Sequence, residues 1–340
     1  MSPSRLVRSG VAVGLEDLTA HTTVPVDRET ASPLCEVVFP DSNESTLPVL
    51  SPAQEGAVRQ VLREWAHIED LATFGARPGL TCLLYGPPGT GKTRLALWMA
   101  QQLGLPAVLA RLDGLISSFL GTTARNIGAL FAFASRYRCV LLLDEFDAIA
   151  KLRNDPHEVG EIKRVVNALL QSLDTRRLIG ITIAITNHEL LLDPAIWRRF
   201  EIQLAVSFPE LEERIRIAEE HLRPLDKPEA ARMLAWLAAG STGAEIESLA
   251  LSVKKATVLG ESENPIFIDL LRQQAIIHGG RISPERLKLL NLPSRDLART
   301  LLSEEQLGFD QNSIGKLFGR DKATISRWVN KNRKPNTHRG

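Results

Sequence analysis

The sequence has few cysteines and no long run of apolar residues. Its three cysteines, Cys35, Cys82 and Cys139, belong to no CxxC pair, which argues against a disulfide framework and a structural zinc site. The longest uncharged apolar stretch considered as a membrane span, residues 178–186, is far shorter than the ~18 residues of a transmembrane helix. No export signal is visible. We therefore expect a cytoplasmic protein that does not cross a membrane.

The overall composition is that of a globular protein, but the charge is unevenly distributed. The 340 residues are 44% hydrophobic and 24% charged, with a net charge of +1, which excludes global disorder. Residues 314–340 carry eight basic side chains and one acidic side chain, so the rest of the chain is acidic. This asymmetry predicts a polyanion-binding C-terminal end.

Changes in composition and in the spacing of apolar residues predict four segments along the chain. Residues 1–50 are rich in Ser, Thr and Pro and are expected to form a flexible or loosely packed leader. Residues 51–208 alternate helical patterns with short apolar runs, which predicts an α/β fold with a parallel sheet covered by helices on both faces. Residues 209–280 read as a small helical domain, and residues 281–340 as short helices with a basic tail. The predicted strands are residues 80–85, 107–110, 139–143, 180–186 and 202–206.

The strongest motif follows the first predicted strand and opens a helix. Its glycines let backbone N–H groups surround phosphates, and the helix N-terminus adds its positive dipole end. Lys92 would reach the β- and γ-phosphates, and the Thr93 hydroxyl would hold Mg²⁺. A structural turn rich in glycine and proline is the alternative. The predicted nucleotide-binding residues are Gly86, Pro87, Pro88, Gly89, Thr90, Gly91, Lys92 and Thr93.

Polar side chains also end two later strands. Asp144 and Glu145 follow the apolar run at 140–143, and parallel strands would deliver both carboxylates beside the phosphate loop. Asp144 would coordinate Mg²⁺, and Glu145 would polarise the attacking water as general base. Asn187 ends the strand at 180–186, where its amide would orient this water or sense the γ-phosphate. As an isolated residue it would instead be a turn former.

With these residues in place, the chain from about 51 to 278 resembles an AAA-type (AAA+) ATPase module. The resemblance rests on GPPGTGKT at 86–93, LLLDEFDAI at 141–149, AITN at 184–187, LDPAIWRRF at 192–200 and GSTGAEIESL at 240–249. It is nearest to the clade of membrane-bound AAA proteases, microtubule-severing ATPases and stand-alone bacterial AAA ATPases, some encoded beside a protease.

The resemblance implies a homo-oligomeric ring, usually a hexamer, with ATP and Mg²⁺ at the subunit junctions. It assigns Arg198 and Arg199 as arginine fingers that reach a neighbour's γ-phosphate, without deciding between them. Without the resemblance, these arginines would be an exposed helix end. It also places Gly243 and Ala244 of the helical lid near the nucleotide.

The same resemblance implies a protein substrate that passes through the ring. It marks Phe119, Leu120 and Gly121 as a pore loop whose aromatic side chain grips a polypeptide, whereas Phe119 could alternatively pack in the core. Residues 151–160 would form a second channel-facing loop. The HExxH signature of the zinc-dependent AAA proteases is missing, so any peptide cleavage would need a separately encoded protease.

The basic C-terminal end resembles bacterial helix-turn-helix domains. Asp310 and Asp321 are expected to cap two short helices around Gly319, and small Gly315 would allow a close approach. A solvated helical cap is the alternative. The side chains predicted to face DNA bases are Lys322, Thr324, Ser326 and Arg327, and those predicted to meet phosphates are Lys331, Arg333 and Lys334.

Two functions are therefore compatible with the sequence. The first is an Mg-ATP-hydrolysing ring ATPase that remodels or threads proteins and is tethered to DNA. The second is a DNA-binding regulator or mobile-element accessory ATPase whose ATP cycle switches assembly. Only the first needs the pore loop.

Overall fold

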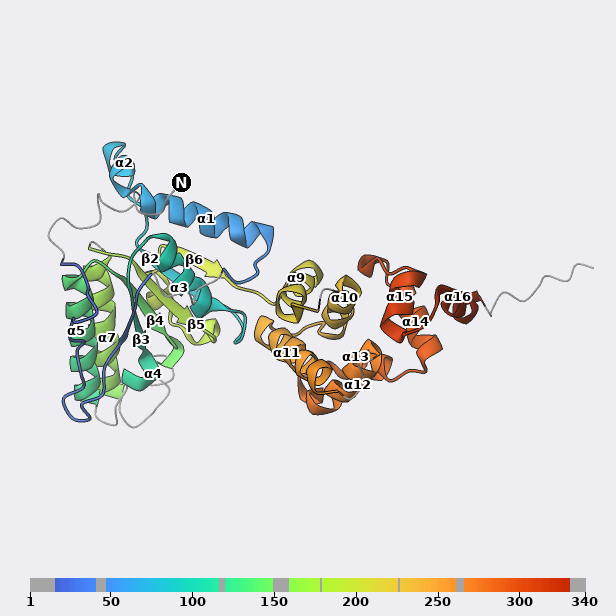
Figure 1. The fold of residues 1–340 in the computed structure, drawn as a ribbon. Coiled ribbons are helices and arrows are strands. Elements are labelled where there is room, and N and C mark those ends of the chain that lie inside the picture. Colours follow the sequence, from blue (N-terminus) through green and yellow to red (C-terminus); the bar gives the residue numbers. More distant parts are fainter. Residues whose placement is uncertain are drawn as a thin grey trace, which may run out of the picture. The chain divides into compact units, whose positions relative to one another are not determined.

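The computed structural model describes residues 16–40, 47–115, 120–148, 159–177, 179–225, 227–260 and 266–330. The chain divides into two compact units, Met1–Ser207 and Phe208–Gly340. The first is an α/β unit and the second is helical (Figure 1).

The first unit is built on a six-stranded sheet with the strand order β1-β3-β4-β5-β2-β6. Its pairings are parallel except for β1, which runs antiparallel to β3 at the edge. The predicted α/β fold and its parallel sheet are therefore confirmed, with an antiparallel edge strand added. The strands are β1 (Glu36–Val38), β2 (Thr81–Tyr85), β3 (Ala107–Arg111), β4 (Val140–Asp144), β5 (Thr182–Thr186) and β6 (Ile202–Ala205).

Helices cover both faces of this sheet because its strands are apolar on both sides. Helices α5 and α7 lie on one side of the sheet, and α1 and α3 on the other (Figure 1). Leu83 packs into the core beneath α5 and α7, whereas its neighbours Cys82 and Leu84 pack into the core beneath α1 and α3. This alternation follows from the period of two in a strand. The helices of the unit are α1 (Pro52–Ala66), α2 (Ile68–Thr73), α3 (Lys92–Gln102), α4 (Leu112–Leu115), α5 (Leu120–Arg136), α7 (Val159–Arg176) and α8 (Pro194–Trp197).

The N-terminal segment differs from the expected loose leader. Leu18 and Leu34 are buried in the core on the α5 side of the sheet, and β1 extends the sheet. The carboxylate of buried Asp27 accepts hydrogen bonds from the backbone N–H of Glu29 and from Nδ2 of Asn126 on α5, at 2.7 and 2.6 Å. Asn126 lies 99 positions from Asp27 in the chain, so the segment needs no local periodicity to be packed.

The second unit consists of helices. The described helices of the C-terminal segment pack against the helices that precede them. Helix α9 packs against α10 and α11, and α15 packs against α10, α12, α14 and α16. Its helices are α9 (Leu211–Leu222), α10 (Pro228–Leu237), α11 (Gly243–Leu259), α12 (Phe267–Ile277), α13 (Pro284–Leu290), α14 (Ser294–Ser303), α15 (Gln311–Phe318) and α16 (Lys322–Asn330).

The connection between α15 and α16 is tight. Asp310 caps α15 through the N–H of Ser313, and Asp321 accepts from the N–H of Thr324 in the first turn of α16. Gly319 ends α15 with φ of 59°, a left-handed conformation that favours glycine. A Cβ on Gly315 would lie 2.5 Å from the carbonyl oxygen of Arg320, so the close approach requires glycine there.

Candidate active site

The candidate site gathers at the carboxyl ends of β2, β4 and β5. These three strands are neighbours, because β5 pairs with both β2 and β4 in parallel. Parallel strands end at the same edge, so the residues that follow them meet there. The loop 86–91 follows β2, Asp144 ends β4 and is followed by Glu145, and Asn187 follows β5.

The loop after β2 has a backbone that only glycine adopts readily. Gly86, Gly89 and Gly91 have φ values of 138°, 77° and 90°. A Cβ on Gly86 would collide with the backbone carbonyl of Val206. Pro48, just before α1, lies against Gly91. Such a loop directs its N–H groups inward and forms a concavity suited to anions at the start of α3.

Lys92 opens α3 and turns back into this loop. Its side chain is buried, and Nζ donates to the carbonyl oxygens of Gly86 and Pro87 at 2.8 and 2.6 Å. Both carbonyls are neutral, so the ammonium is desolvated without a directly bonded anion. Burial lowers the pKa of Lys92 to about 8, although nearby carboxylates, with Asp144 the strongest, oppose this. An anion bound in the loop would form an ion pair with the Lys92 ammonium.

Thr93 and Asp144 form the second part of the site. The Thr93 hydroxyl donates to Oδ2 of Asp144 at 2.8 Å, and the Glu145 N–H donates to Oδ1 of the same carboxylate at 2.8 Å. A hydroxyl and a carboxylate are hard oxygen ligands of the kind that Mg²⁺ takes together with waters and substrate phosphates. The residues present therefore fit a magnesium ion held with a phosphorylated ligand.

Glu145 lies beside this pair in an unusual backbone conformation. Its φ is 54°, which is uncommon for a residue with a side chain and is found most often at functional sites. The pKa of Glu145 is raised above its usual range, chiefly by a hydrogen bond between its carboxyl and that of Asp113 and further by desolvation. Asp113 lies in α4, just after β3.

Two residues of this neighbourhood were not predicted from the sequence. Asp113 was missed although, like Asp144, it closely follows a buried strand. Asp147 is buried and accepts from the hydroxyl of Thr186 at 3.3 Å and from the N–H of Asn187 at 3.5 Å. It therefore orients the end of β5 toward the end of β4. Its signal was the third acidic residue of the DEFD stretch at 144–147.

The two candidate arginines lie away from the phosphate loop of their own chain. The backbone carbonyl of Arg199 accepts from the hydroxyl of Thr81, the first residue of β2, whereas the loop follows the last residue of that strand. At about 3.3 Å per residue, these points are roughly 13 Å apart. The Arg199 guanidinium donates to the carbonyl of Ala195 and pairs with Asp174 at 3.5 Å, whereas Arg198 is exposed.

Other predicted site residues lie elsewhere in the chain. Phe119 is outside the described residues, as are residues 151–158, and Leu120 and Gly121 begin α5 rather than forming part of a loop. Gly243 and Ala244 begin α11 in the second unit, after the N-cap Thr242. Lys322, Thr324, Ser326 and Arg327 lie on α16, where Arg327 donates to the Thr324 hydroxyl at 2.9 Å. Lys331, Arg333 and Lys334 are outside the described residues.

Two other features are absent from the described part of the chain. No described helix has both the length and the apolar character needed to span a bilayer. Among the described residues, no three His, Cys, Asp or Glu side chains are placed to share a metal ion.

Comparison with known proteins agrees with this geometry. Residues 82–208 match the family model described as "ATPase family associated with various cellular activities (AAA)". The chain is 42% identical over 182 residues to an uncharacterised AAA family ATPase, y4kL, of Sinorhizobium fredii, covering 54% of this chain and 55% of that protein. It is 32% identical over 247 residues to the ATP-dependent zinc metalloprotease FtsH 3 of Sphaerobacter thermophilus, covering 70% of this chain and 49% of that protein.

A solved structure shares the fold. The crystal structure of the FIGL-1 AAA domain superposes with a TM-score of 0.57 at 20% identity, covering 80% of this chain and 92% of that one. The chain spans about half the length of the curated relatives it matches.

Proposed function

We propose that this chain, whose residues 82–208 form an AAA ATPase domain, hydrolyses ATP with the help of Mg²⁺. The hydrogen bond between the Thr93 hydroxyl and Asp144, beside a glycine loop that buries Lys92, is the observation that carries the proposal. It joins a phosphate-binding loop to a metal-binding carboxylate. A structural turn would need neither a buried, unneutralised ammonium nor this pairing.

Each residue has a role in this proposal. The loop amides and Lys92 hold the β- and γ-phosphates, while Thr93 and Asp144 hold Mg²⁺. When held by these residues, Mg²⁺ would neutralise charge that develops on the phosphates. Glu145 accepts a proton from the attacking water, and Asn187 orients this water.

The active assembly in this proposal is a homo-oligomer, a hexamer, because the backbone of Arg199 lies beside the first residue of β2, away from the phosphate loop of its own chain. Of the two candidates, we assign Arg198 as the residue that reaches a neighbour's γ-phosphate. Arg199 is held by Asp174 and the carbonyl of Ala195, whereas Arg198 is exposed. A guanidinium supplied from another subunit stabilises the charge of the transition state.

The Glu145→Gln substitution tests the assignment of the base. The amide keeps the size of the side chain but accepts no proton, so we expect ATP to bind and turnover to fall by about 10²–10⁴-fold. Nucleotide binding is measured by calorimetry and turnover by phosphate release. A variant that hydrolyses ATP at the normal rate would show that Glu145 is not the base.

We propose further that the ATPase cycle remodels or threads a protein substrate. Phe119, Leu120 and Gly121 precede or begin α5, where the family resemblance implies the pore loop. A separately encoded protease could receive the threaded protein. Phe119→Ala is expected to retain ATP binding but to lose processing of an unfolded protein substrate. Undiminished processing would exclude this role.

The second unit supports a DNA tether. Helices α14, α15 and α16 pack together, with exposed Arg320 and Lys322 at the turn and Arg327 further along α16, and the charge of residues 314–340 favours a polyanion. The alternative function, a DNA-binding regulator or mobile-element accessory ATPase, uses the same surface. If DNA rather than unfolded protein stimulates hydrolysis, and Phe119 is dispensable, the alternative is correct.

A further inference from the structure

One face of α10 carries three side chains that contact the C-terminal helices. Glu229, Arg232 and Trp236 have the spacing i, i+3 and i+7, so they lie on the same side of the helix. Each of them contacts a different part of the chain between α13 and α15. Helix α10 therefore holds this segment at three separate places.

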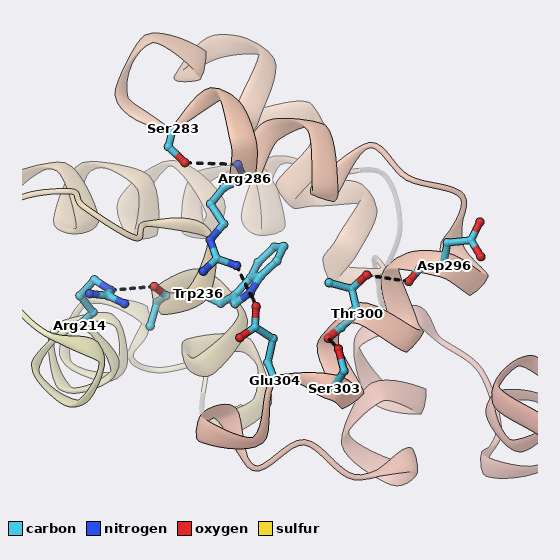
Figure 2. Close-up of polar contacts among 9 residues, drawn as sticks. Arg214, Trp236, Ser283, Arg286, Asp296, Thr300, Ser303 and Glu304 are labelled. Atoms are coloured by element: carbon cyan, nitrogen blue, oxygen red, sulfur yellow. Dashed lines mark hydrogen bonds and ion pairs between the residues drawn. The ribbon is translucent and has the colours of Figure 1, made fainter.

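Trp236 forms the centre of the first contact (Figure 2). Its ring is buried, its Nε1–H donates to Oε1 of Glu304 at 3.1 Å, and the Arg286 guanidinium lies 4.5 Å from the ring centroid. Arg286 also pairs with the same Glu304 oxygen at 3.2 Å. Because Arg286 lies on α13 and Glu304 follows α14, this triad fastens both helices to α10.

Arg232 holds the connection between α14 and α15. Its guanidinium donates to the carbonyl oxygens of Leu307 and Gly308, at 3.1 and 2.9 Å, and lies 5.0 Å from the ring centroid of buried Phe309. Gly308 has a φ of 58°, so the chain turns sharply at a residue that Arg232 binds. Because buried carbonyls need partners, the shape of this connection depends on α10.

Two further contacts fix α15 and the turn after it. Glu229, whose side chain is 9% exposed, pairs with Lys316 on α15 at 3.7 Å. A Cβ on Gly319, which ends α15, would lie 3.1 Å from Cγ1 of Ile266, the residue before α12. The turn that leads into α16 is therefore packed against the start of α12.

Helices α14 to α16 are a small set that depends on these neighbours. Residues 294–330 fall below the ~40 residues under which a domain is usually unstable by itself. Helix α16 contacts α14 and α15, and Arg299 on α14 donates to the carbonyl of Trp328 on α16 at 2.9 Å. The position of α16 thus follows from those of α14 and α15, which α10 holds.

We infer that α10 positions α16 for DNA, so that Trp236, Arg232 and Glu229 are positioning residues of the proposed DNA site. This inference rests on the proposed binding of DNA. When the contacts of α10 are broken, α16 samples arrangements that do not bind, and the apparent dissociation constant rises in inverse proportion to the aligned fraction. The DNA-binding body then extends from α10 to α16, beyond the segment 281–340.

The test measures the affinity of the full-length protein for a labelled DNA duplex of random sequence, by fluorescence anisotropy at several salt concentrations. Arg232→Met removes both hydrogen bonds and the charge but keeps a long side chain. We expect the dissociation constant to rise at least about fivefold. The slope of log affinity against log salt should not change, because Arg232 binds carbonyls of its own chain rather than phosphate.

Three other variants complete this test. Lys331→Gln, at a predicted phosphate contact, should reduce the salt slope by about one. Arg214→Met is the matched control for lost charge, because Arg214 also donates to two backbone carbonyls, those of Pro209 and Ala235, but both lie before α11. It should keep the parental affinity. Arg232→Lys keeps the charge and a donor for the same carbonyls, so it should restore most of the affinity.

Hydrogen exchange of the parent protein provides a measurement that needs no substitution. DNA that selects the aligned arrangement should slow the exchange of backbone amides in α10 as well as in α16, because coupling is reciprocal. A C-terminal domain that binds DNA independently of α10 would show slower exchange in α14 to α16 alone.

The outcomes separate this inference from the proposed tether. A parent protein that does not bind DNA would remove the tether and the inference with it. If DNA binds, then parental affinity of Arg232→Met, a salt slope reduced by about one in that variant, or unchanged exchange in α10 would each show that α10 does not position α16, and the tether would remain. If thermal unfolding shows that Arg232→Met is not folded, the exchange measurement decides.

Discussion

At the scale of single residues, Lys92 carries the clearest physical signature of the site. Its ammonium is buried against two backbone carbonyls, and burial lowers its pKa from the usual 10.5 to about 8. A phosphate placed in the loop would favour the charged form and raise this pKa again. Binding of nucleotide should therefore be coupled to uptake of a proton.

The predicted consequence is a pH dependence of ATP affinity. Below about pH 8 Lys92 is already protonated, whereas above it the free protein must take up a proton, so affinity should fall by up to about tenfold per pH unit. Calorimetry in buffers of different ionisation enthalpy measures the proton directly. Lys92→Arg keeps its charge throughout and should show no uptake. An affinity that is constant from about pH 8 to about pH 9.5 would contradict this account.

At the scale of elements, glycines decide how closely α15 and α16 are joined. Gly315 lies within a helix, where glycine is normally unfavourable, yet a Cβ there would lie 2.5 Å from the Arg320 carbonyl. This carbonyl is backbone and cannot move aside like a flexible side chain. Gly128, within α5, is the opposite case, because nothing lies within 4 Å of its added Cβ.

Replacing each glycine with alanine should change stability in opposite directions. Gly315→Ala should lower the free energy of unfolding of the second unit by about 1–3 kcal/mol through overpacking. Gly128→Ala should raise that of the first unit by about 0.5–1 kcal/mol through helix propensity. Calorimetric unfolding measures both changes. A stabilising Gly315→Ala would show that the turn can open without cost.

At the scale of the whole molecule, the proposed site residues lie in two separate places in the first unit. The phosphate loop, Asp144 and Glu145 meet at one edge of the sheet, whereas Arg199 is anchored at Thr81, where β2 begins. Arg198, its neighbour, is exposed. Completion of the site by Arg198 of a second copy of the chain is our reason for proposing an oligomer.

Mixing two inactive variants tests this requirement. Glu145→Gln lacks the base and Arg198→Ala lacks the finger, yet a site between one subunit of each kind can be complete. In an equal mixture about a quarter of the sites should be complete, so ATP turnover should reappear where neither variant alone has any. Arg199→Ala should retain more activity than Arg198→Ala. Mixtures that stay inactive would argue against sharing of the site between subunits.

How well the sequence predicted the structure depended on how far apart the contacting residues lie along the chain. The strand that ends in Asp144 and the caps Asp310 and Asp321 were predicted because their signals lie within a few positions. The packing of residues 16–40 was not, because the hydrogen bond from Asn126 to Asp27 joins residues 99 positions apart. Asp113 was missed because its partner Glu145 lies on a different strand end.

The amino-acid sequence by itself determined the glycine loop after β2, the two acids at the end of β4 and the alternation of helices with strands β2 to β6, since short-range spacing and apolar periodicity encode them. Only the tertiary structure decided that Arg199 is the arginine bound to Asp174 and that β1 pairs with the edge of β3. It alone also decided how α10 contacts the segment from α13 to α15. Those outcomes depend on contacts such as Trp236 with Glu304, 68 positions apart, and side chains so distant in the chain become neighbours only when the core has formed.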